Sequence, residues 1–104
     1  MAVINLTNET FDEAIAKGVT LVAFGAGWCA PCQMIADPLA ELAEEFDGRA
    51  VIATVETDAN PELAAKMKIR LLPTIISYKD GVQSEKAYGA ESKERMAEMI
   101  NALL

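Results

Sequence analysis

Residues 19–32 read VTLVAFGAGWCAPC, and the rest of the chain can be interpreted outward from this stretch. Its first six residues are almost wholly apolar or β-branched, which is typical of a strand buried on both faces. The stretch ends with Cys29 and Cys32, the only two cysteines of the chain. Helical spacing of apolar residues starts at Ala30, so the cysteines lie where a buried strand passes into a helix.

Strands and helices alternate on both sides of this stretch. Short apolar runs predict strands, and apolar residues at helical spacing predict helices. In chain order we expect a strand at 3–6, a helix after a cap at Thr7 or Asn8, a strand at 19–24, a helix at 30–46, a strand at 51–55, a helix at 61–67 after Asn60, strands at 74–78 and 82–88 joined by an Asp-Gly turn, and a last helix through 96–103. Pro38 leaves the carbonyl of Met34 without its helical partner, which predicts a kink.

The element order is therefore βαβαβαββα. Strands separated by helices imply a parallel sheet with helices on both faces, and the final hairpin adds antiparallel strands at one edge. We expect an α/β fold with a central mixed five-stranded sheet. Because 104 residues suit one domain, and no repeat or linker interrupts them, residues 1–104 are predicted to form a single domain.

Composition excludes several functional classes. The chain has 16 acidic and 9 basic side chains, no histidine and a formal net charge of −7. A nucleic-acid binder normally carries a basic surface, so no nucleic-acid partner is expected. Two cysteines are also too few for a disulfide scaffold, which typically has more than roughly 8–10% cysteine.

The N-terminal residues and the hydropathy pattern bear on location. The first basic residue is Lys17, and no apolar run near the start is long enough for a signal peptide. The longest apolar runs have about six residues, whereas a transmembrane helix needs about 20. We therefore expect no membrane association and a cytoplasmic location. In a reducing cytosol, a close cysteine pair is more often catalytic or metal-binding than structural.

Three uses of the cysteine pair remain open from the residues alone. A zinc site would need ligands from a second molecule or from carboxylates, because the chain has no other cysteine and no histidine. A structural bridge would close a very short loop, where the gain in chain entropy is smallest. A redox pair suits the position best, since N–H groups at a helix start favour the thiolate of Cys29. Cys32, one turn further along, could then resolve a mixed disulfide.

The motif Trp28-Cys29-Ala30-Pro31-Cys32 resembles the signature of the thioredoxin family. The apolar strand before it, the helix start after it, the later Leu72-Pro73-Thr74 and the final Tyr88-Gly89-Ala90 are similar to that family as well. The resemblance runs from about residue 3 to the end of the chain. It implies the thioredoxin fold, with Cys29 as the attacking thiol and Cys32 as the resolving thiol.

The resemblance also implies a surface for substrate proteins. Leu72-Pro73 is similar to the family's cis-proline turn, where an extended substrate pairs with the backbone at Leu72. An apolar surface around Cys29 would comprise Trp28, Ala30, Pro31, Leu71, Leu72, Tyr88, Gly89 and Ala90. Pro73 and two positions of this surface have a simpler interpretation: Pro73 as a proline that starts a strand, Tyr88 as a packed strand residue, and Gly89 as a turn glycine.

Two residues depart from the family in a way that affects mechanism. Ala23 and Thr54 stand where most thioredoxins have a buried aspartate and its lysine partner. Loss of both together avoids a single buried charge, which would cost roughly 3–5 kcal/mol. Cys32 must then lose its proton to water, to the departing thiolate or to another base. Glu56 is a candidate, because it shares a strand face with Thr54, but its simpler interpretation is a solvent-facing carboxylate at the end of a strand.

Smaller departures surround the motif. Ala30 replaces the usual glycine between the cysteines, and Gly25 stands where the family often has a second tryptophan. Gln33 replaces the usual lysine after the second cysteine, which removes a cation that would favour the thiolate. Pro38 lies one position later than the family's kink proline.

The resemblance implies a thiol–disulfide oxidoreductase that reduces protein disulfides and serves as an electron carrier in cell redox homeostasis. Its redox-active centre is the Cys29–Cys32 disulfide bond, and no bound cofactor or metal is implied. Its partners would be disulfide-containing proteins and a flavin-containing thioredoxin reductase, and the chain would be a monomer. The alternative is a binding module of the same fold with little redox turnover.

Overall fold

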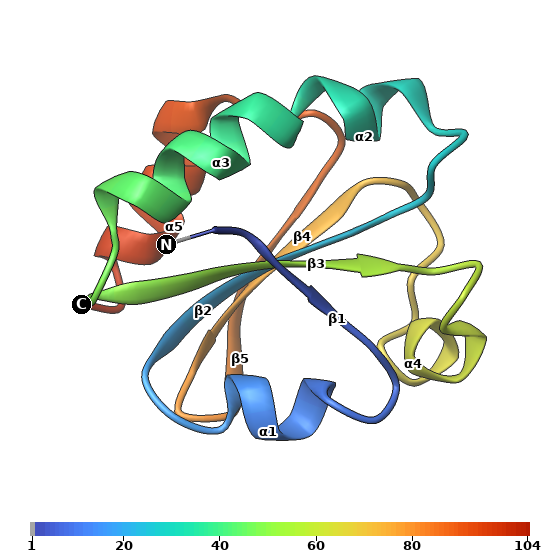
Figure 1. The fold of residues 1–104 in the computed structure, drawn as a ribbon, viewed down its shortest axis with the longest axis horizontal. Helices are drawn as coiled ribbons and strands as arrows, with labels where there is room; N and C mark the ends of the chain where they lie inside the picture. Colours follow the sequence, from blue (N-terminus) through green and yellow to red (C-terminus); the bar gives the residue numbers. More distant parts are fainter. Residues whose placement is uncertain (1) are drawn as a thin grey trace.

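A computed structural model describes residues 2–104 (Figure 1). Its elements in chain order are β1 (Ile4–Leu6), α1 (Phe11–Ile15), β2 (Val19–Gly25), α2 (Ala30–Met34), α3 (Ala36–Glu45), β3 (Ala50–Glu56), α4 (Pro61–Lys66), β4 (Thr74–Lys79), β5 (Val82–Tyr88) and α5 (Lys93–Asn101). The predicted alternation is confirmed, with one predicted helix divided into α2 and α3.

The sheet is mixed and has five strands in the order β1-β3-β2-β4-β5. Strand β3 runs parallel to both β1 and β2, whereas β4 is antiparallel to β2 and to β5. Strand β2 is therefore central, as its apolar sequence predicts. The α/β fold with a mixed five-stranded sheet is confirmed.

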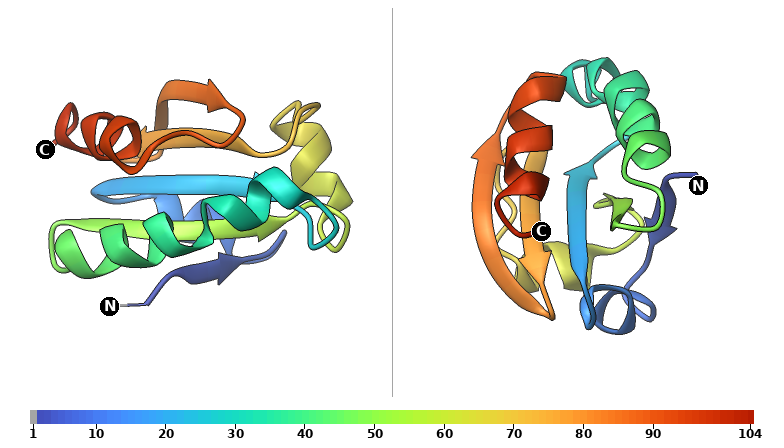
Figure 2. Two further views of the ribbon diagram at one scale, coloured as in Figure 1. Left: turned by 90° about the horizontal axis from the view of Figure 1, so that it is seen from above. Right: turned by 90° about the vertical axis from the view of Figure 1, so that its left-hand side faces the viewer.

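Helices cover both faces of the sheet (Figures 1 and 2). Helices α3 and α5 pack on one face, where Leu21 and Ala23 of β2 join their core. Helices α1 and α4 lie on the other face, where Val22 and Phe24 contribute to a second core. Alternate residues of β2 thus serve opposite faces, which fixes its register against β3 and β4.

The helix predicted at 30–46 is two helices. α2 ends at Met34 and α3 begins at Ala36, with Ile35 between them. Pro38 has no N–H for the carbonyl of Met34, so the α-helical ladder cannot continue across this point. The predicted kink is confirmed, and the prediction of one continuous helix is wrong.

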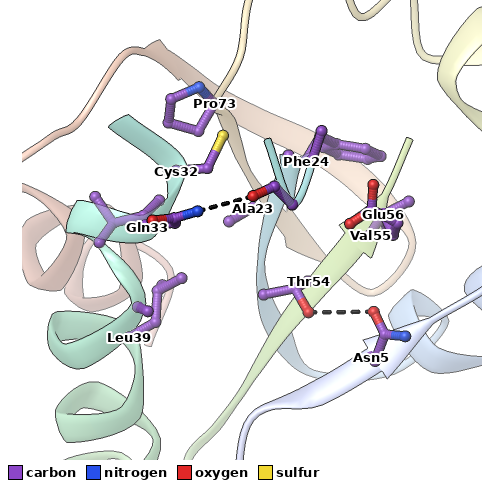
Figure 3. Close-up of a pocket in the computed structure, with 15 residues that line it drawn as sticks. Asn5, Ala23, Phe24, Cys32, Gln33, Leu39, Thr54, Val55, Glu56 and Pro73 are labelled. Carbon is purple, nitrogen blue, oxygen red and sulfur yellow. Dashed lines mark hydrogen bonds between the residues drawn. The ribbon is translucent and has the colours of Figure 1, made fainter. Parts of the chain in front are cut away.

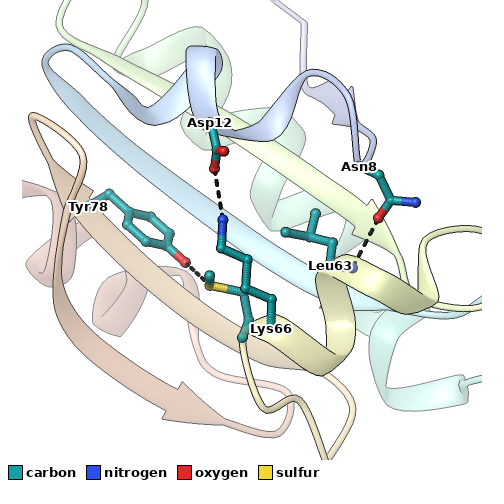
Figure 4. Close-up of polar contacts among 6 residues, drawn as sticks. Asn8, Asp12, Leu63, Lys66 and Tyr78 are labelled. Carbon is teal, nitrogen blue, oxygen red and sulfur yellow. Dashed lines mark hydrogen bonds and ion pairs between the residues drawn. The ribbon is translucent and has the colours of Figure 1, made fainter.

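Helix α1 begins later than predicted. Its N-cap is Thr10 rather than Thr7 or Asn8, and the Thr7 carbonyl accepts the N–H groups of Thr10 and Phe11. The Asn8 side chain instead accepts the Leu63 N–H of α4 at 3.0 Å (Figure 4). Asn60 Oδ1 accepts the Asn8 N–H at 3.0 Å, so two loops cap one another.

The turns and the last helix follow local signals. Asp80 and Gly81 both have positive φ, 49° and 84°, as a two-residue hairpin turn of type I′ requires. The Ser92 hydroxyl accepts the Arg95 N–H and caps α5, a signal that the apolar spacing alone does not contain.

Polar contacts join α1, α4 and β4 on one face (Figure 4). Lys66 of α4 pairs with Asp12 of α1 at 3.4 Å. The buried Tyr78 hydroxyl donates to the Met67 sulfur at 3.3 Å. Burial raises the pKa of Tyr78 to about 12. Over residues 2–104, no helix has the length and apolar character needed to cross a bilayer.

Candidate active site

The cysteine pair lies at the start of α2. Cys29 is the N-cap residue, and its Sγ accepts the Cys32 N–H at 3.3 Å. The two sulfurs form a disulfide, and the Cα atoms are 5.3 Å apart. When the disulfide opens, the same N–H group can stabilise negative charge on the Cys29 sulfur.

The loop before the motif is held by hydrogen bonds. The Gln33 side-chain amide donates to the Gly27 carbonyl at 2.7 Å. The Cys29 N–H donates to the Ala26 carbonyl at 3.1 Å. Gln33, which supplies no charge, therefore has a positioning role for the segment that carries Trp28.

A cavity of about 230 Å³ reaches Cys32 (Figure 3). Its lining includes Cys32 but not Cys29. Cys29 is only 5% exposed, whereas Cys32 is partly exposed. The lining residues come from β1, β2, β3, the helices α2 and α3 and the turn at Pro73; they include Asn5, Ala23, Gly25, Leu39, Thr54 and Glu56.

Small residues create this cavity. Ala23 and Thr54 are register partners on β2 and β3, which confirms that the two departures from the family lie side by side. Thr54 Oγ1 donates to Asn5 Oδ1 at 3.3 Å. A Cβ atom on Gly25 would lie 3.0 Å from the Cys32 sulfur, so the absent side chain leaves this sulfur uncovered.

Among the described residues 2–104, Glu56 is the only ionisable side chain of the lining other than Cys32. It is the register partner of Gly25, and paired residues on parallel strands direct their side chains to one face. Among residues 2–104, its carboxylate has no hydrogen-bond or ion-pair partner. Glu56 therefore lines the same cavity as Cys32, and its carboxylate is not engaged by another described residue.

The Leu72–Pro73 peptide bond is cis, as the resemblance implies. The Thr74 hydroxyl donates to the Leu71 carbonyl at 2.6 Å, and the Gly89 N–H donates to the Pro73 carbonyl at 2.9 Å. Pro73 also lines the Cys32 cavity. These contacts bring the turn, the end of β5 and the cysteines together.

An apolar surface lies around the motif. Trp28 is 72% exposed, Leu71 is 59% exposed and Tyr88 is 54% exposed. Ala30, Pro31 and Ala90 are exposed, and Leu72 and Gly89 are partly exposed. We call this set the docking surface: Trp28, Ala30, Pro31, Leu71, Leu72, Tyr88, Gly89 and Ala90.

Two residues of this region were not predicted from the sequence. Asp58 accepts the Trp28 indole N–H at 2.6 Å and orients the ring. It lies in a polar loop with no pattern that would single it out. Met34 is 69% exposed and follows Pro31 by three residues, so helical spacing could have added it to the docking surface. Within residues 2–104, no group of three or more potential metal ligands occurs.

Comparisons with known proteins agree with this geometry. The thioredoxin family model matches residues 2–102. A thioredoxin of Staphylococcus haemolyticus is 46% identical over 101 residues, covering 97% of each chain. A thioredoxin of Staphylococcus aureus is 43% identical with the same coverage. The structure of a mutant thioredoxin from Halobacterium salinarum superimposes with a TM-score of 0.91 at 30% identity, covering 98% of this chain and 90% of that one.

Proposed function

Because this chain belongs to the thioredoxin family, we propose that Cys29 is its attacking thiol and Cys32 its resolving thiol. The chain is a thiol–disulfide oxidoreductase that reduces protein disulfides through a reversible Cys29–Cys32 cycle. The hydrogen bond from the Cys32 N–H to the Cys29 sulfur carries the assignment of roles. It favours the thiolate of Cys29, and the thiolate is the nucleophile.

The steps of the cycle follow from these roles. The Cys29 thiolate attacks one sulfur of a substrate disulfide and forms a mixed disulfide, while the other substrate sulfur leaves as a thiolate. Cys32 then loses its proton and attacks the Cys29 sulfur. The second substrate thiolate leaves, and the Cys29–Cys32 disulfide remains. Two electrons have passed to the substrate, and a partner reductase returns them.

We propose that the docking surface binds the substrate protein. Among residues 2–104, neither the N–H nor the carbonyl of Leu72 has a backbone partner, so both are available to an extended substrate segment. Such pairing adds a short strand and sets the substrate disulfide against the cysteines. Trp28, Leu71 and Tyr88 supply exposed apolar contact beside it.

We propose Glu56 as the proton acceptor for Cys32. Both groups line one cavity, and no side chain at Gly25 separates them. A cavity with the polar atoms of Asn5, Thr54 and Glu56 can hold a water molecule that relays the proton. Glu56→Gln should abolish one step in the pH profile of disulfide reduction, and Glu62→Gln, a carboxylate outside this cavity, should keep it. An unchanged profile in Glu56→Gln would leave water or the departing thiolate as the acceptor.

We propose further that residues 1–104 act as one domain and as a monomer in the cytoplasm, where they carry electrons from a flavoprotein thioredoxin reductase. The bacterial thioredoxins at 43–46% identity support these assignments by relationship. Light scattering should give the mass of one chain. NADPH oxidation by a flavoprotein thioredoxin reductase should depend on the oxidised protein, and no such dependence would contradict the partner assignment.

A mixed-disulfide trap tests the assignment of cysteine roles. Cys32→Ser can form the mixed disulfide but cannot resolve it, so it should accumulate a covalent adduct with a disulfide-containing protein such as insulin. Peptide mass mapping should place the adduct on Cys29. Cys29→Ser is the matched control and should accumulate much less adduct. Equal adducts on the two variants would overturn the assignment.

A further inference from the structure

Two features of the structure adjoin the Cys29–Cys32 disulfide. One is the docking surface around the motif, and the other is the cavity of about 230 Å³ that reaches Cys32 and is also lined by Gly27 and Pro73. Figure 3 shows Cys32 of α2 among the lining residues, with Pro73 close to it and Glu56 on strand β3. Nothing in the proposed protein-disulfide cycle uses this cavity for an incoming molecule.

The size and lining of the cavity define what could enter it. Typical ligand pockets have volumes of roughly 300–1,000 Å³, so this cavity suits a molecule much smaller than a peptide. Its walls are mainly apolar, with the polar atoms of Asn5, Gln33 and Thr54 and one carboxylate at Glu56. Within the described part of the chain, no lysine or arginine lines it. An anionic ligand would therefore meet repulsion, whereas a neutral or cationic one would not.

The reactive atom at the cavity is a disulfide sulfur. The cavity touches Cys32 and not Cys29, and the absent side chain of Gly25 leaves the Cys32 sulfur uncovered. The choice of sulfur in thiol–disulfide exchange depends on access and on the leaving thiolate. Cys29 is the better leaving group, because the Cys32 N–H stabilises its thiolate.

We propose that this cavity admits small neutral or cationic thiols, which reduce the oxidised protein by attack on Cys32. A small thiolate forms a bond to the Cys32 sulfur, the Cys29–Cys32 bond breaks, and Cys29 leaves as a thiolate. A second small thiol attacks the small-molecule sulfur of the Cys32 adduct. The products are a small disulfide and a Cys32 thiolate, which takes up a proton. Two thiols supply the two electrons, so this route recharges the protein without a reductase.

Site mapping tests the proposal on the unmodified protein. Oxidised protein is mixed with cysteamine, quenched with acid within the first turnover and examined by peptide mass mapping. The early adduct should lie on Cys32. An adduct mainly on Cys29 would overturn the proposal, whatever the variants below show.

A pair of substitutions tests the entrance. Thr54→Leu should fill the cavity, whereas Thr54→Val keeps its size and loses only the hydroxyl that donates to Asn5. The rate of disulfide reduction by 2-mercaptoethanol should be about tenfold lower in Thr54→Leu than in Thr54→Val, because both variants lack the hydroxyl and only the first closes access to the attacked sulfur. Equal rates in the two variants would overturn the proposal.

The charge of the cavity gives an independent readout. Cysteamine and mercaptoacetate differ in charge, and their rate ratio cancels any general effect of a variant on the disulfide. Glu56→Gln should lower the cysteamine-to-mercaptoacetate ratio by about fivefold, the factor expected for one nearby, partly screened charge. Glu62→Gln should keep the ratio, and an unchanged ratio in Glu56→Gln would contradict entry beside this carboxylate.

Failure of this proposal can be told apart from failure of the assigned cysteine roles. The trap with Cys32→Ser reports attack by Cys29 on a protein disulfide and needs no small thiol. Cysteamine mapping reports attack on Cys32 and needs no protein substrate. Each result stands without the other.

Discussion

Gly25 and Ala23 do most to distinguish the reactive site. Both lie near the C-terminal end of the central strand β2 and line the cavity together with Cys32. Both have side chains too small to cover the Cys32 sulfur. Thr54, the register partner of Ala23, adds a hydroxyl instead of a charge. The identity of these residues is visible in the sequence. Their joint effect, a cavity that reaches one sulfur and not the other, depends on packing and could not be read from it.

Among single residues, Asp58 should set the orientation of Trp28. The carboxylate accepts the indole N–H at 2.6 Å, and Asp58→Ala would release an exposed ring from the docking surface. A charge-assisted bond at an exposed site is worth about 1 kcal/mol, so KM for insulin reduction should rise about fivefold with little change in kcat. Asp12→Ala, a carboxylate on α1, should leave KM unchanged. A fall in kcat alone would contradict a docking role.

Some helix boundaries differ from the sequence predictions for local reasons, and others depend on distant residues. The break at Ile35 follows from Pro38 and was foreseeable as a kink, because proline has no backbone N–H to donate to the Met34 carbonyl. The sequence predicts the start of α4 only in part. Pro61 marks the start, but the side chain that caps the Leu63 N–H belongs to Asn8, 55 residues earlier in the sequence.

The hydrogen bonds that Asn8 makes with Asn60 and Leu63 should stabilise the packing of α4 against the loop before α1. Asn8→Ala removes the acceptor for the Leu63 N–H, and a lost cap typically costs about 1 kcal/mol, with a range of about 0.5–2 kcal/mol. Urea unfolding measures the change in the free energy of unfolding. Asn101→Ala, an exposed asparagine at the end of α5, should change that free energy by less than about 0.5 kcal/mol. Equal effects of the two substitutions would argue against a capping role for Asn8.

For the molecule as a whole, the alternation of strands and helices predicts the fold class, and the observed sheet agrees. The central position of β2 follows from its apolar sequence, and the antiparallel hairpin follows from Asp80 and Gly81. The docking surface is less predictable. Trp28, Leu71 and Tyr88 come from three separate segments, which only the tertiary fold connects: the Gly89 N–H bonds the Pro73 carbonyl, and Pro73 lines one cavity with Gly27 and Cys32.

Global stability should depend on pH through Tyr78. Burial raises the pKa of this phenol from 10.0 to about 12, so the fold favours its neutral form. The resulting stability is fully present below pH 10 and is lost as the pH rises through about 12, because the unfolded chain releases the proton first. The loss is at most about 1.4 kcal/mol per pH unit. Tyr78→Phe should remove this part of the slope in urea unfolding, and equal slopes would contradict it.

Insulin reduction in the presence of dithiothreitol is the decisive assay for the Cys29–Cys32 cycle. We expect the wild-type protein to accelerate precipitation of the insulin B chain well above the rate with dithiothreitol alone. Cys29→Ser and Cys32→Ser should both lose this acceleration, because each lacks one sulfur of the cycle. A wild-type rate equal to the uncatalysed rate, or full acceleration by Cys29→Ser, would show that the protein does not work through this cycle.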